Sequence, residues 1–308
     1  MLPIRPKLTV LLILLCFFLS ACQVSAVNEG SAQSPAPDLP APPTLILPTQ
    51  TPAEPAPAIA PSPTAADNLN QSFADLKSKL IDGVDWYILI QGANENETLF
   101  EMNPNTAFPP ASMIKIPTAL AVLSILEDQG RSLENLKTTG INGRNFDSLL
   151  EAMVIHSEES ATDALEYFAR GDNQLRKKLD GWGLNNTKYD PRTSTASELL
   201  TSLKLLNIGS VLNEEYTQYL LGLMGAYTEN DQILLGKLND ELPGCAFFNK
   251  RGTMLNPTIV SDMGILSCGE RSWYLVVAGT PAVDSTATFE DIQASIEDFA
   301  VAFANLVK

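Results

Sequence analysis

The sequence of residues 68–308 predicts an α/β domain of the α+β type: an antiparallel five-stranded sheet flanked by terminal helices, with an inserted all-helical lobe. Three observations predict it. Strand-like segments fall into an early group and a late group. Apolar residues recur at helical spacing near both ends. The segment between the two groups, about 112–235, is helical in pattern and is punctuated by glycines.

Five segments have the composition of strands. Two precede the helical segment, at 84–91 and 97–101, and three follow it, at about 246–253, 259–267 and 272–279. The last of them reads Ser-Trp-Tyr-Leu-Val-Val-Ala-Gly and is rich in the aromatic and β-branched residues of strands. The economical architecture is one antiparallel sheet that carries the helical lobe as an insertion.

Two terminal helices are expected beside this sheet. Their apolar positions, three or four residues apart, are Leu69, Phe73, Leu76 and Leu80 at one end and Ile292, Ile296, Phe299 and Phe303 at the other. Thr288 with Asp291 three residues later resembles a capping box, so the second helix is expected to begin there.

The first 21 residues have the features of a signal peptide. Arg5 and Lys7 precede an apolar run of 12 residues, 8–19, which is too short to span a bilayer as a helix. The run ends in Leu-Ser-Ala-Cys22, which resembles the lipobox of bacterial lipoproteins. That resemblance implies cleavage before Cys22 and its acylation, for instance with palmitate, which would anchor the protein to the membrane. An ordinary signal peptide with an incidental cysteine is the alternative.

Residues 22–67 contain the acylated cysteine and a linker rich in proline and alanine. Eleven prolines lie between 23 and 67 without a hydrophobic period, which predicts a tether and not a domain. The net charge is −16, and it becomes −18 when the two positive charges of Arg5 and Lys7 leave with the signal peptide. No basic stripe is present, so nucleic acid is not expected as a partner.

Two cysteines, Cys245 and Cys268, remain in the exported domain, where oxidation is permitted. They flank the first two late strands, and a symmetric hairpin would place them opposite each other. A disulfide there would close a 24-residue loop and stabilise the fold by about 3–4 kcal/mol. Two free buried thiols are the alternative.

The chemistry is expected at Ser112-Met-Ile-Lys115, where an apolar helical run begins after two prolines. No other serine in the chain has a lysine three residues downstream. On a helix this spacing puts the hydroxyl and the amine on one face, about 5–6 Å apart at Cβ. A partly buried lysine loses protonated character and can accept the serine proton, so the pair can form a nucleophile with its own base.

Two later segments fit this lysine-based chemistry. His156-Ser-Glu-Glu159 forms a turn between two helices, and Lys250-Arg-Gly-Thr253 lies on a late strand, where its glycine lets a substrate approach the backbone closely. His156 is the single histidine, so a Ser-His-Asp triad could form only around it. One histidine also supplies too few nitrogen ligands for a zinc site. No metal and no cofactor are expected.

With these three segments in order, residues 68–308 resemble the penicillin-recognising serine hydrolases, specifically the class A β-lactamase-like group. Ser112 and Lys115 match the family's S-x-x-K nucleophile and base, and Ser157 matches the serine of its S-D-N turn. Lys250 and Gly252 match the lysine and glycine of K-T-G. The resemblance implies a β-lactamase/transpeptidase-like fold and an acyl-enzyme on Ser112.

The resemblance also implies the parts of the catalytic machinery. Lys115 would be the base, and Ser157 and Lys250 would relay a proton to the leaving nitrogen. The backbone N–H groups of Ser112 and Thr253 would form the oxyanion hole.

Glu159 and Arg251 depart from the family's pattern at two positions that, with Gly252, are expected to contact the substrate. Glu159 replaces the asparagine of S-D-N, and an ionised carboxylate can only accept a hydrogen bond. It would also raise the pKa of Lys115 and oppose its work as a base. Arg251 replaces the threonine of K-T-G, and it can either grip an anion or fill the groove. The two residues can also pair with each other.

The segment 188–192 stands where the family has an omega loop, whose glutamate, in an E-P-x-L-N segment, activates the hydrolytic water. Here Lys-Tyr-Asp190-Pro191-Arg passes almost directly into the next helix, so the loop is shorter by about ten residues. Asp190 is either a remnant of that carboxylate or part of a plain Asp-Pro turn. Without a positioned base, the acyl-enzyme is expected to persist.

These features predict an extracytoplasmic lipoprotein, anchored by Cys22, with a slow or atypical β-lactamase-type hydrolase domain. Its expected partners are a β-lactam or peptidoglycan-type small molecule and the membrane, and a monomer is expected. A D-alanyl-D-alanine peptidase acting on peptidoglycan is the second hypothesis. The third is a non-catalytic binding lipoprotein that keeps the fold; an unreactive Ser112 with Glu159 bonded to Lys115 would favour it.

Overall fold

The computed structural model describes residues 74–93, 97–226 and 233–308. The expected signal peptide, Cys22 and the proline-rich linker lie outside these described residues, as do Leu69 and Phe73 of the first expected helix. Across the described ranges, no helix combines the length and the apolar character needed to cross a membrane.

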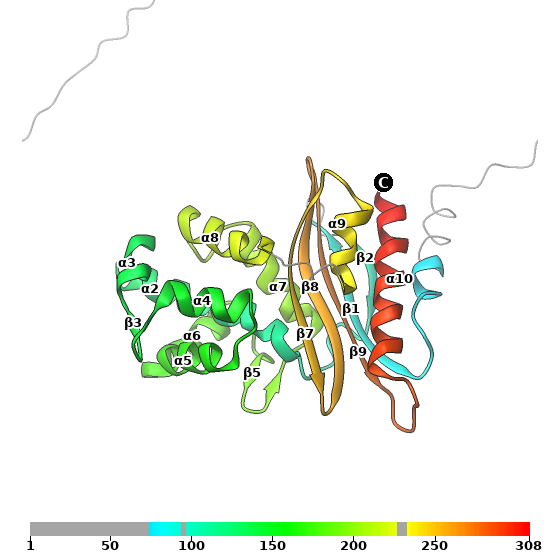
Figure 1. Ribbon diagram of the computed structural model, residues 1–308, viewed down its shortest axis with the longest axis horizontal. Helices are drawn as coiled ribbons and strands as arrows, with labels where there is room; N and C mark the ends of the chain where they lie inside the picture. Colours follow the sequence, from blue (N-terminus) through cyan, green and yellow to red (C-terminus); the bar gives the residue numbers. More distant parts are fainter. Residues whose placement is uncertain (1–73, 94–96, 227–232) are drawn as a thin grey trace, which may run out of the picture. The chain divides into compact units, whose positions relative to one another are not determined.

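A five-stranded antiparallel sheet forms the frame of the domain (Figure 1). Its strands are β1 (Val84–Gly92), β2 (Thr98–Met102), β7 (Ala246–Leu255), β8 (Thr258–Cys268) and β9 (Arg271–Pro281). Their order is β2-β1-β9-β8-β7, so the early strands join the late ones where β1 pairs with β9. The predicted sheet is confirmed, and β7 is one of its two edge strands, with a strand neighbour on one side only.

Alternating side chains of β9 contribute to two hydrophobic cores, one on each face of the sheet. Tyr274 and Val276 belong to the core that the sheet shares with the helical lobe, whereas Leu275 and Val277 belong to the core under the C-terminal helix. Both faces of this central strand are buried, which explains the continuous apolar run in its sequence.

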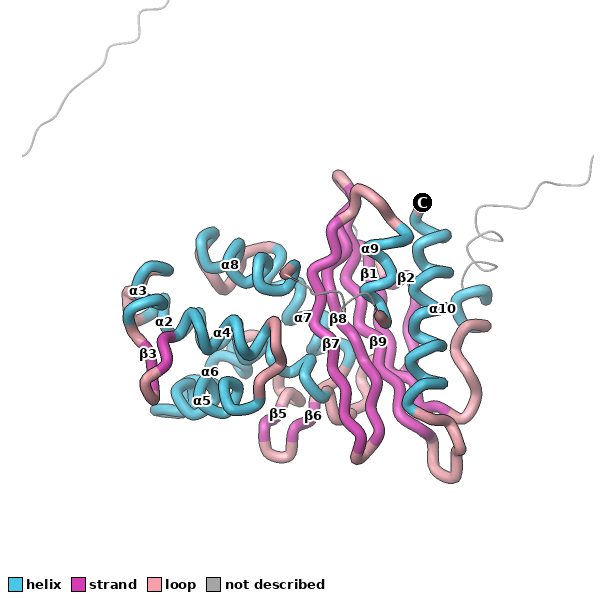
Figure 2. The backbone as a smooth tube through the Cα atoms, in the orientation of Figure 1, coloured by secondary structure: helices cyan, strands magenta, loops and turns pink. Residues whose placement is uncertain are grey.

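Helix α10 (Phe289–Val307) covers one face of the sheet, with η4 (Leu234–Lys237) and α9 (Leu238–Glu241) beside it (Figure 2). The predicted capping box fixes its first turn. Thr288 Oγ1 accepts a hydrogen bond from the Asp291 N–H, and the Asp291 carboxylate accepts one from the Thr288 N–H. The helix therefore begins where the sequence predicts.

The helical lobe packs against the other face of the sheet. Its helices are η1 (Ala111–Ile114), α2 (Lys115–Asp128), α3 (Leu133–Thr138), α4 (Phe146–Val154), α5 (Glu159–Arg170), η2 (Gly171–Asn173), α6 (Gln174–Gly181), α7 (Ala196–Asn207) and α8 (Glu214–Gly225). Helix α2 is the centre of the lobe, because every residue from Lys115 to Leu126 is buried. A helix buried all round must be almost wholly apolar, which makes the charge of Lys115 the exception that needs partners.

Two short hairpins interrupt the segment that was expected to be entirely helical. They pair β3 (Gly140–Ile141) with β4 (Arg144–Asn145), and β5 (Lys188–Tyr189) with β6 (Arg192–Thr193). In the first, Asn142 and Gly143 have φ angles of 50° and 79°, the left-handed conformations that an Asn-Gly hairpin turn requires. The expectation of an all-helical lobe was wrong here because local turn residues override the surrounding helical pattern.

Cys245 and Cys268 form the predicted disulfide, with Cα atoms 4.4 Å apart. Ala246 pairs with Ser267 in the β7–β8 hairpin, so the cysteines lie directly beyond the last paired residues. They are bonded to each other and are not two free thiols.

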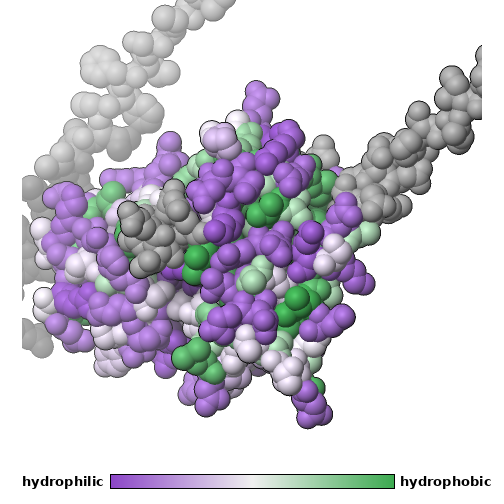
Figure 3. Space-filling view, turned by 45° about the vertical axis from the view of Figure 1, so that its right-hand side comes forward, coloured by the Kyte–Doolittle hydropathy of each residue, from purple (hydrophilic) through white to green (hydrophobic). Residues whose placement is uncertain are grey.

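The face of the domain in Figure 3 is mostly hydrophilic, with small separate hydrophobic areas. Scattered apolar residues of this kind are normal on a protein surface and do not by themselves mark a binding site.

Candidate active site

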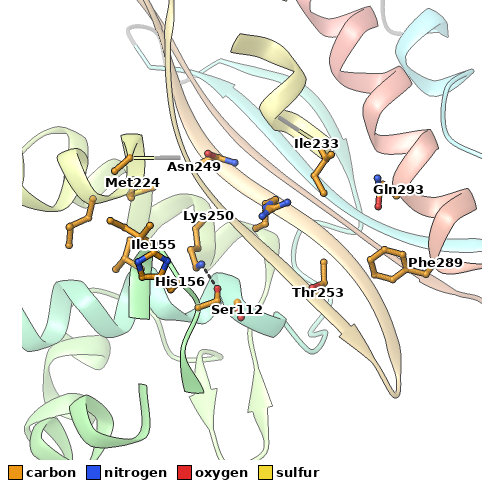
Figure 4. Close-up of a pocket in the computed structure, with 15 residues that line it drawn as sticks. Ser112, Ile155, His156, Met224, Ile233, Asn249, Lys250, Thr253, Phe289 and Gln293 are labelled. Carbon is orange, nitrogen blue, oxygen red and sulfur yellow. Dashed lines mark hydrogen bonds between the residues drawn. The ribbon is translucent and has the colours of Figure 1, made fainter. Parts of the chain in front are cut away.

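A cavity of about 330 Å³ lies between the helical lobe and the edge strand β7 (Figure 4). Ser112 and Ser157 line it from the lobe, and Lys250, Arg251 and Thr253 line it from β7. These residues come from all three segments that the sequence predicts to carry the chemistry.

Ser112 lies in η1, a 3₁₀ turn that leads into α2, and not within an α-helix. Side chains three residues apart are eclipsed in a 3₁₀ turn, so Ser112 and Lys115 point the same way. Lys115 Nζ donates a hydrogen bond to Ser112 Oγ at 3.0 Å. Ala111 enters the turn with a φ of 47°, a conformation that is rare outside glycine and that concentrates at functional sites.

Lys115 is completely buried and donates to three groups. Besides Ser112, these are the Ser157 carbonyl oxygen at 2.7 Å and Glu159 Oε1 at 2.5 Å. Burial lowers the pKa of the Lys115 amine; the hydrogen bond and charge of Glu159 oppose this, and the net direction is downward. The expected contact with Glu159 is present, and Glu159 acts to raise the pKa of Lys115 as expected, but the lowering by burial, which was also expected, is larger.

Ser157 connects the two lysines of the cavity. Its carbonyl oxygen accepts from Lys115, and its Oγ accepts a short hydrogen bond from Lys250 Nζ, which Figure 4 marks with a dashed line. Its φ of 54° is again a left-handed conformation, which turns the chain before α5 begins at Glu159. Lys250 is itself buried, so its charge faces the cavity and not bulk solvent.

Gly252 is required by the packing of β7 against η1. A Cβ at this position would lie 2.8 Å from the Pro110 carbonyl oxygen, 3.0 Å from the Met113 nitrogen and 2.7 Å from Ser261 Oγ. The neighbouring backbone therefore excludes a side chain here, and the close approach of a substrate to Gly252 stays a prediction. This close packing brings Thr253 up to the turn that holds Ser112, the two residues predicted to form the oxyanion hole.

Arg192 has a place in the site that its position in the sequence does not reveal. From the shortened β5–β6 hairpin, its Nη1 donates to Glu159 Oε2 at 2.7 Å and its Nη2 to Glu166 Oε1 at 3.2 Å. Glu159 therefore lies between two cations, Lys115 and Arg192. Burial raises the pKa of the Glu159 carboxyl, but the hydrogen bonds from these cations outweigh burial and hold it below its usual value.

Arg251 lies opposite Asp262 in the register of β7 and β8. Asp262 is completely buried, and Asn249 Nδ2 donates to both of its carboxylate oxygens at 3.1 Å. Burial raises the pKa of Asp262 to about 7, although Asn249 and Arg251 act in the opposite direction. The two residues that depart from the family pattern thus face different groups of opposite charge. Arg251 lies opposite Asp262, whereas Glu159 pairs with Lys115 and Arg192.

Asp190 lies in the turn of the β5–β6 hairpin, where it is exposed, and it is not among the residues that line the cavity. This placement favours the plain Asp-Pro turn over a remnant of a loop carboxylate. His156, the single histidine, does line the cavity and is exposed there.

Residues 68–299 match the family model described as the β-lactamase enzyme family. Among solved structures, the TLA-1 extended-spectrum β-lactamase is similar with a TM-score of 0.65 at 19% identity, covering 78% of this chain and 99% of that one. PBP-A is similar with a TM-score of 0.63 at 17% identity, with coverage of 78% and 96%. A β-lactamase from Chitinophaga pinensis DSM 2588 is similar with a TM-score of 0.62 at 18% identity, covering 78% of this chain and 100% of that one. No curated protein matches the chain.

At these identities the solved structures establish a shared fold alone. The family model spans most of the chain and includes all three segments that line the cavity. The chain therefore belongs to the β-lactamase enzyme family.

Proposed function

We propose that this protein is a serine hydrolase of the β-lactamase type in which Ser112 forms an acyl-enzyme. The observation that carries the proposal is the buried Lys115 amine, 3.0 Å from the Ser112 hydroxyl. An amine whose pKa is lowered by burial can accept the hydroxyl proton as Ser112 attacks a carbonyl carbon.

The leaving nitrogen receives its proton from the other side of the cavity. Ser157 Oγ is bonded to the Lys250 cation, so the hydroxyl can donate its proton to the nitrogen while Lys250 stabilises the oxygen. The backbone N–H groups of Ser112 and Thr253 are the proposed oxyanion donors. The packing at Gly252 supports this assignment because it holds the two segments together.

The proposed substrate is a strained lactam or a peptide amide of small-molecule size. Two of the similar solved structures are β-lactamases, which favours a lactam. The cations of Lys250 and Arg251, both on the cavity lining, suit a substrate carboxylate. Glu159 can accept from a substrate N–H but cannot donate to a carbonyl, so we expect slow or atypical turnover.

A D-alanyl-D-alanine peptidase that acts on peptidoglycan is the second candidate. The hairpin over 188–193 brings no loop carboxylate into the cavity lining, since Asp190 lies outside it. A persistent acyl-enzyme would then be expected, and PBP-A shares the fold. A non-catalytic binding protein is the third candidate, which the Lys115–Glu159 ion pair would support if Ser112 proved unreactive.

We further propose that the domain works outside the cytoplasm as a monomer, tethered to the membrane through acylated Cys22. The disulfide between Cys245 and Cys268 supports an exported setting. Replacing Cys22 by Ser should move the protein from the membrane fraction to the soluble fraction, and an unchanged distribution would contradict the anchor.

The proposed reaction is tested by the intact mass of the protein over time after mixing with a penicillin, beside the Ser112→Ala variant. We expect an adduct that the variant lacks, which would establish the nucleophile. The lifetime of the adduct then separates a lactamase from a penicillin-binding enzyme. Absence of any adduct and of any lactam hydrolysis would contradict β-lactam chemistry and favour the binding protein.

A further inference from the structure

The Glu159 carboxylate lies close to the Ser112 hydroxyl, because the Lys115 amine contacts both groups. Lys115 Nζ contacts both Ser112 Oγ, at 3.0 Å, and Glu159 Oε1, at 2.5 Å. The hydroxyl and the carboxylate are therefore no further apart than these two contacts laid end to end. One bridging water molecule can span that distance.

Glu159 also keeps the capacity to bind such a water. A carboxylate has about four acceptor sites on its two oxygens, and Lys115 and Arg192 each occupy one, on different oxygens. The Glu159 side chain is 56% exposed, whereas the Lys115 side chain is not exposed at all. Solvent therefore reaches this network at its carboxylate.

Arg192 holds that carboxylate in place. Its Nη1 binds Glu159 at 2.7 Å, while its Nη2 is anchored to Glu166, a nearly buried carboxylate about two helical turns further along α5. The guanidinium fork thus fixes Glu159 against the body of the lobe. Glu166 itself is bound by both Arg170 and Arg192, which makes it an anchor for Arg192.

We propose that Glu159 is the base that activates the water which hydrolyses the acyl group from Ser112. The proposal rests on the proposed acyl-enzyme. It places the activation of water at the start of α5, because the shortened hairpin brings no carboxylate into the cavity lining. Arg192 is the positioning residue, since it holds the Glu159 carboxylate in place.

The step balances as follows. A water oxygen forms a bond to the acyl carbon, and its proton passes to Glu159. The bond from that carbon to Ser112 Oγ then breaks, and Oγ takes a proton from the Lys115 ammonium. The acid product leaves with Lys115 again a neutral amine, Glu159 releases its proton to solvent, and Ser157 regains from solvent the proton that it gave to the leaving nitrogen. The site is then ready for a second turnover.

The state of Glu159 before reaction agrees with this role. Burial raises the pKa of Glu159, but Lys115 and Arg192 outweigh it, so the carboxyl is ionised at neutral pH and able to accept a proton. A base with a lowered pKa is also a weak base, which is consistent with slow turnover.

The test is the rate of deacylation in the Glu159→Gln variant of the full chain, measured by intact mass after a brief exposure to a penicillin. We expect the lifetime of the adduct to increase by about 10²-fold, the usual effect of losing a general base. Glu158→Gln is the matched control. It makes the same change one residue earlier, where the carboxylate pairs with Arg144, and it should leave the lifetime unchanged.

An adduct that Glu159→Gln releases as fast as the unaltered protein does would overturn the assignment and leave the acyl-enzyme intact. If neither protein forms an adduct and no lactam is hydrolysed, the proposed function itself fails. If Glu159→Gln is not acylated while the unaltered protein is, the lifetime of the adduct is measured on Glu159→Asp instead. A shortened carboxylate that serves as the base should slow adduct loss at least about 10-fold, whereas an unchanged rate would contradict the proposal.

Discussion

The two walls of the cavity hold their functional groups by different means. On the β7 wall, backbone packing and strand register place Lys250 and Thr253, because Gly252 leaves no room between β7 and η1. On the lobe side, where Lys115 contacts the lining residues Ser112 and Ser157, ion pairs hold the groups in place. Glu159 stays beside Lys115 with Arg192 on its other oxygen. The comparison teaches that a change of side-chain chemistry is tolerated where a new counter-charge is at hand. Where backbone contact sets the geometry, the residue type is fixed.

The largest effect is expected from Gly252→Ala, which acts on the β7 wall. The added methyl would meet the Pro110 carbonyl at 2.8 Å and the Met113 nitrogen at 3.0 Å, so β7 must move away from η1. Loss of a well-placed oxyanion donor typically lowers rates by about 10²–10³-fold, and we expect acylation to fall by that amount. Gly92→Ala on β1, where the methyl would meet nothing within 4 Å, is the control and should acylate normally. Equal acylation rates in the two variants would show that the packing does not set the oxyanion geometry.

The next effect concerns Asp262, the buried carboxyl beneath the same wall. Its pKa of about 7 lies above the value of 3.8 for an unperturbed aspartate. The folded protein favours the protonated form of this carboxyl. The contribution of Asp262 to the stability of the fold is therefore fully present below about pH 3.8 and is lost as the pH rises towards 7. Between pH 5 and pH 8 this loss is on the order of 2–3 kcal/mol, and Asp262→Asn should not show it.

Thermal unfolding of both proteins at pH 5 and pH 8 measures this difference. The Tm of Asp262→Asn relative to the unaltered protein should rise between the two pH values. A constant difference in Tm would mean that the carboxyl at Asp262 does not titrate in this range.

On the lobe wall, Arg192→Met should reduce the free energy of unfolding by about 1–3 kcal/mol, because it leaves the nearly buried Glu166 without one of its partners. Arg144→Met is the matched control. It breaks a pair with Glu158 that is well exposed on both sides, and it should cost less than about 1 kcal/mol. Urea unfolding measures both, and equal losses would indicate that the Arg192 network is no more than a surface ion pair.

The smallest effect is expected from Glu159→Asn, which restores the amide that the family carries at this position. Removing the carboxylate lowers the pKa of Lys115 further, and we expect acylation to become a few-fold faster. An unchanged acylation rate would contradict the view that Glu159 makes Lys115 a poorer base. A gain in acylation together with a longer-lived adduct would show that the residue slows one step and serves the other.

Much of the fold could be predicted from the sequence because its signals are local. The capping box at Thr288, the apolar strands and the cysteines that flank a hairpin each depend on neighbouring residues or on one strand pairing. The hairpin at Asn142 was missed although its Asn-Gly turn is also local, because the helical pattern around it dominated the interpretation.

The sequence predicts that Ser112, Ser157, Lys250 and Thr253 share one site, and the cavity brings them together, but the sequence predicts neither Arg192 nor the balance of charge and burial around Lys115. The spacing of Ser112 and Lys115 shows that they are neighbours, yet the direction of the pKa of Lys115 depends on how completely the surrounding lobe excludes water. The link from Arg192 to Glu159 joins residues 33 positions apart, and no periodicity encodes such a contact.

The sequence by itself determined the five strands of the main sheet and the C-terminal helix, the three segments that line the cavity and the pairing of Cys245 with Cys268. These follow from turn residues, apolar periodicity and motif spacing, which act over short distances along the chain. Only the tertiary structure decided which charges compensate one another: Glu159 with Lys115 and Arg192, and Arg251 with Asp262. The reason is that burial and ion pairing depend on distances through space, which are set only when the lobe and the sheet pack together.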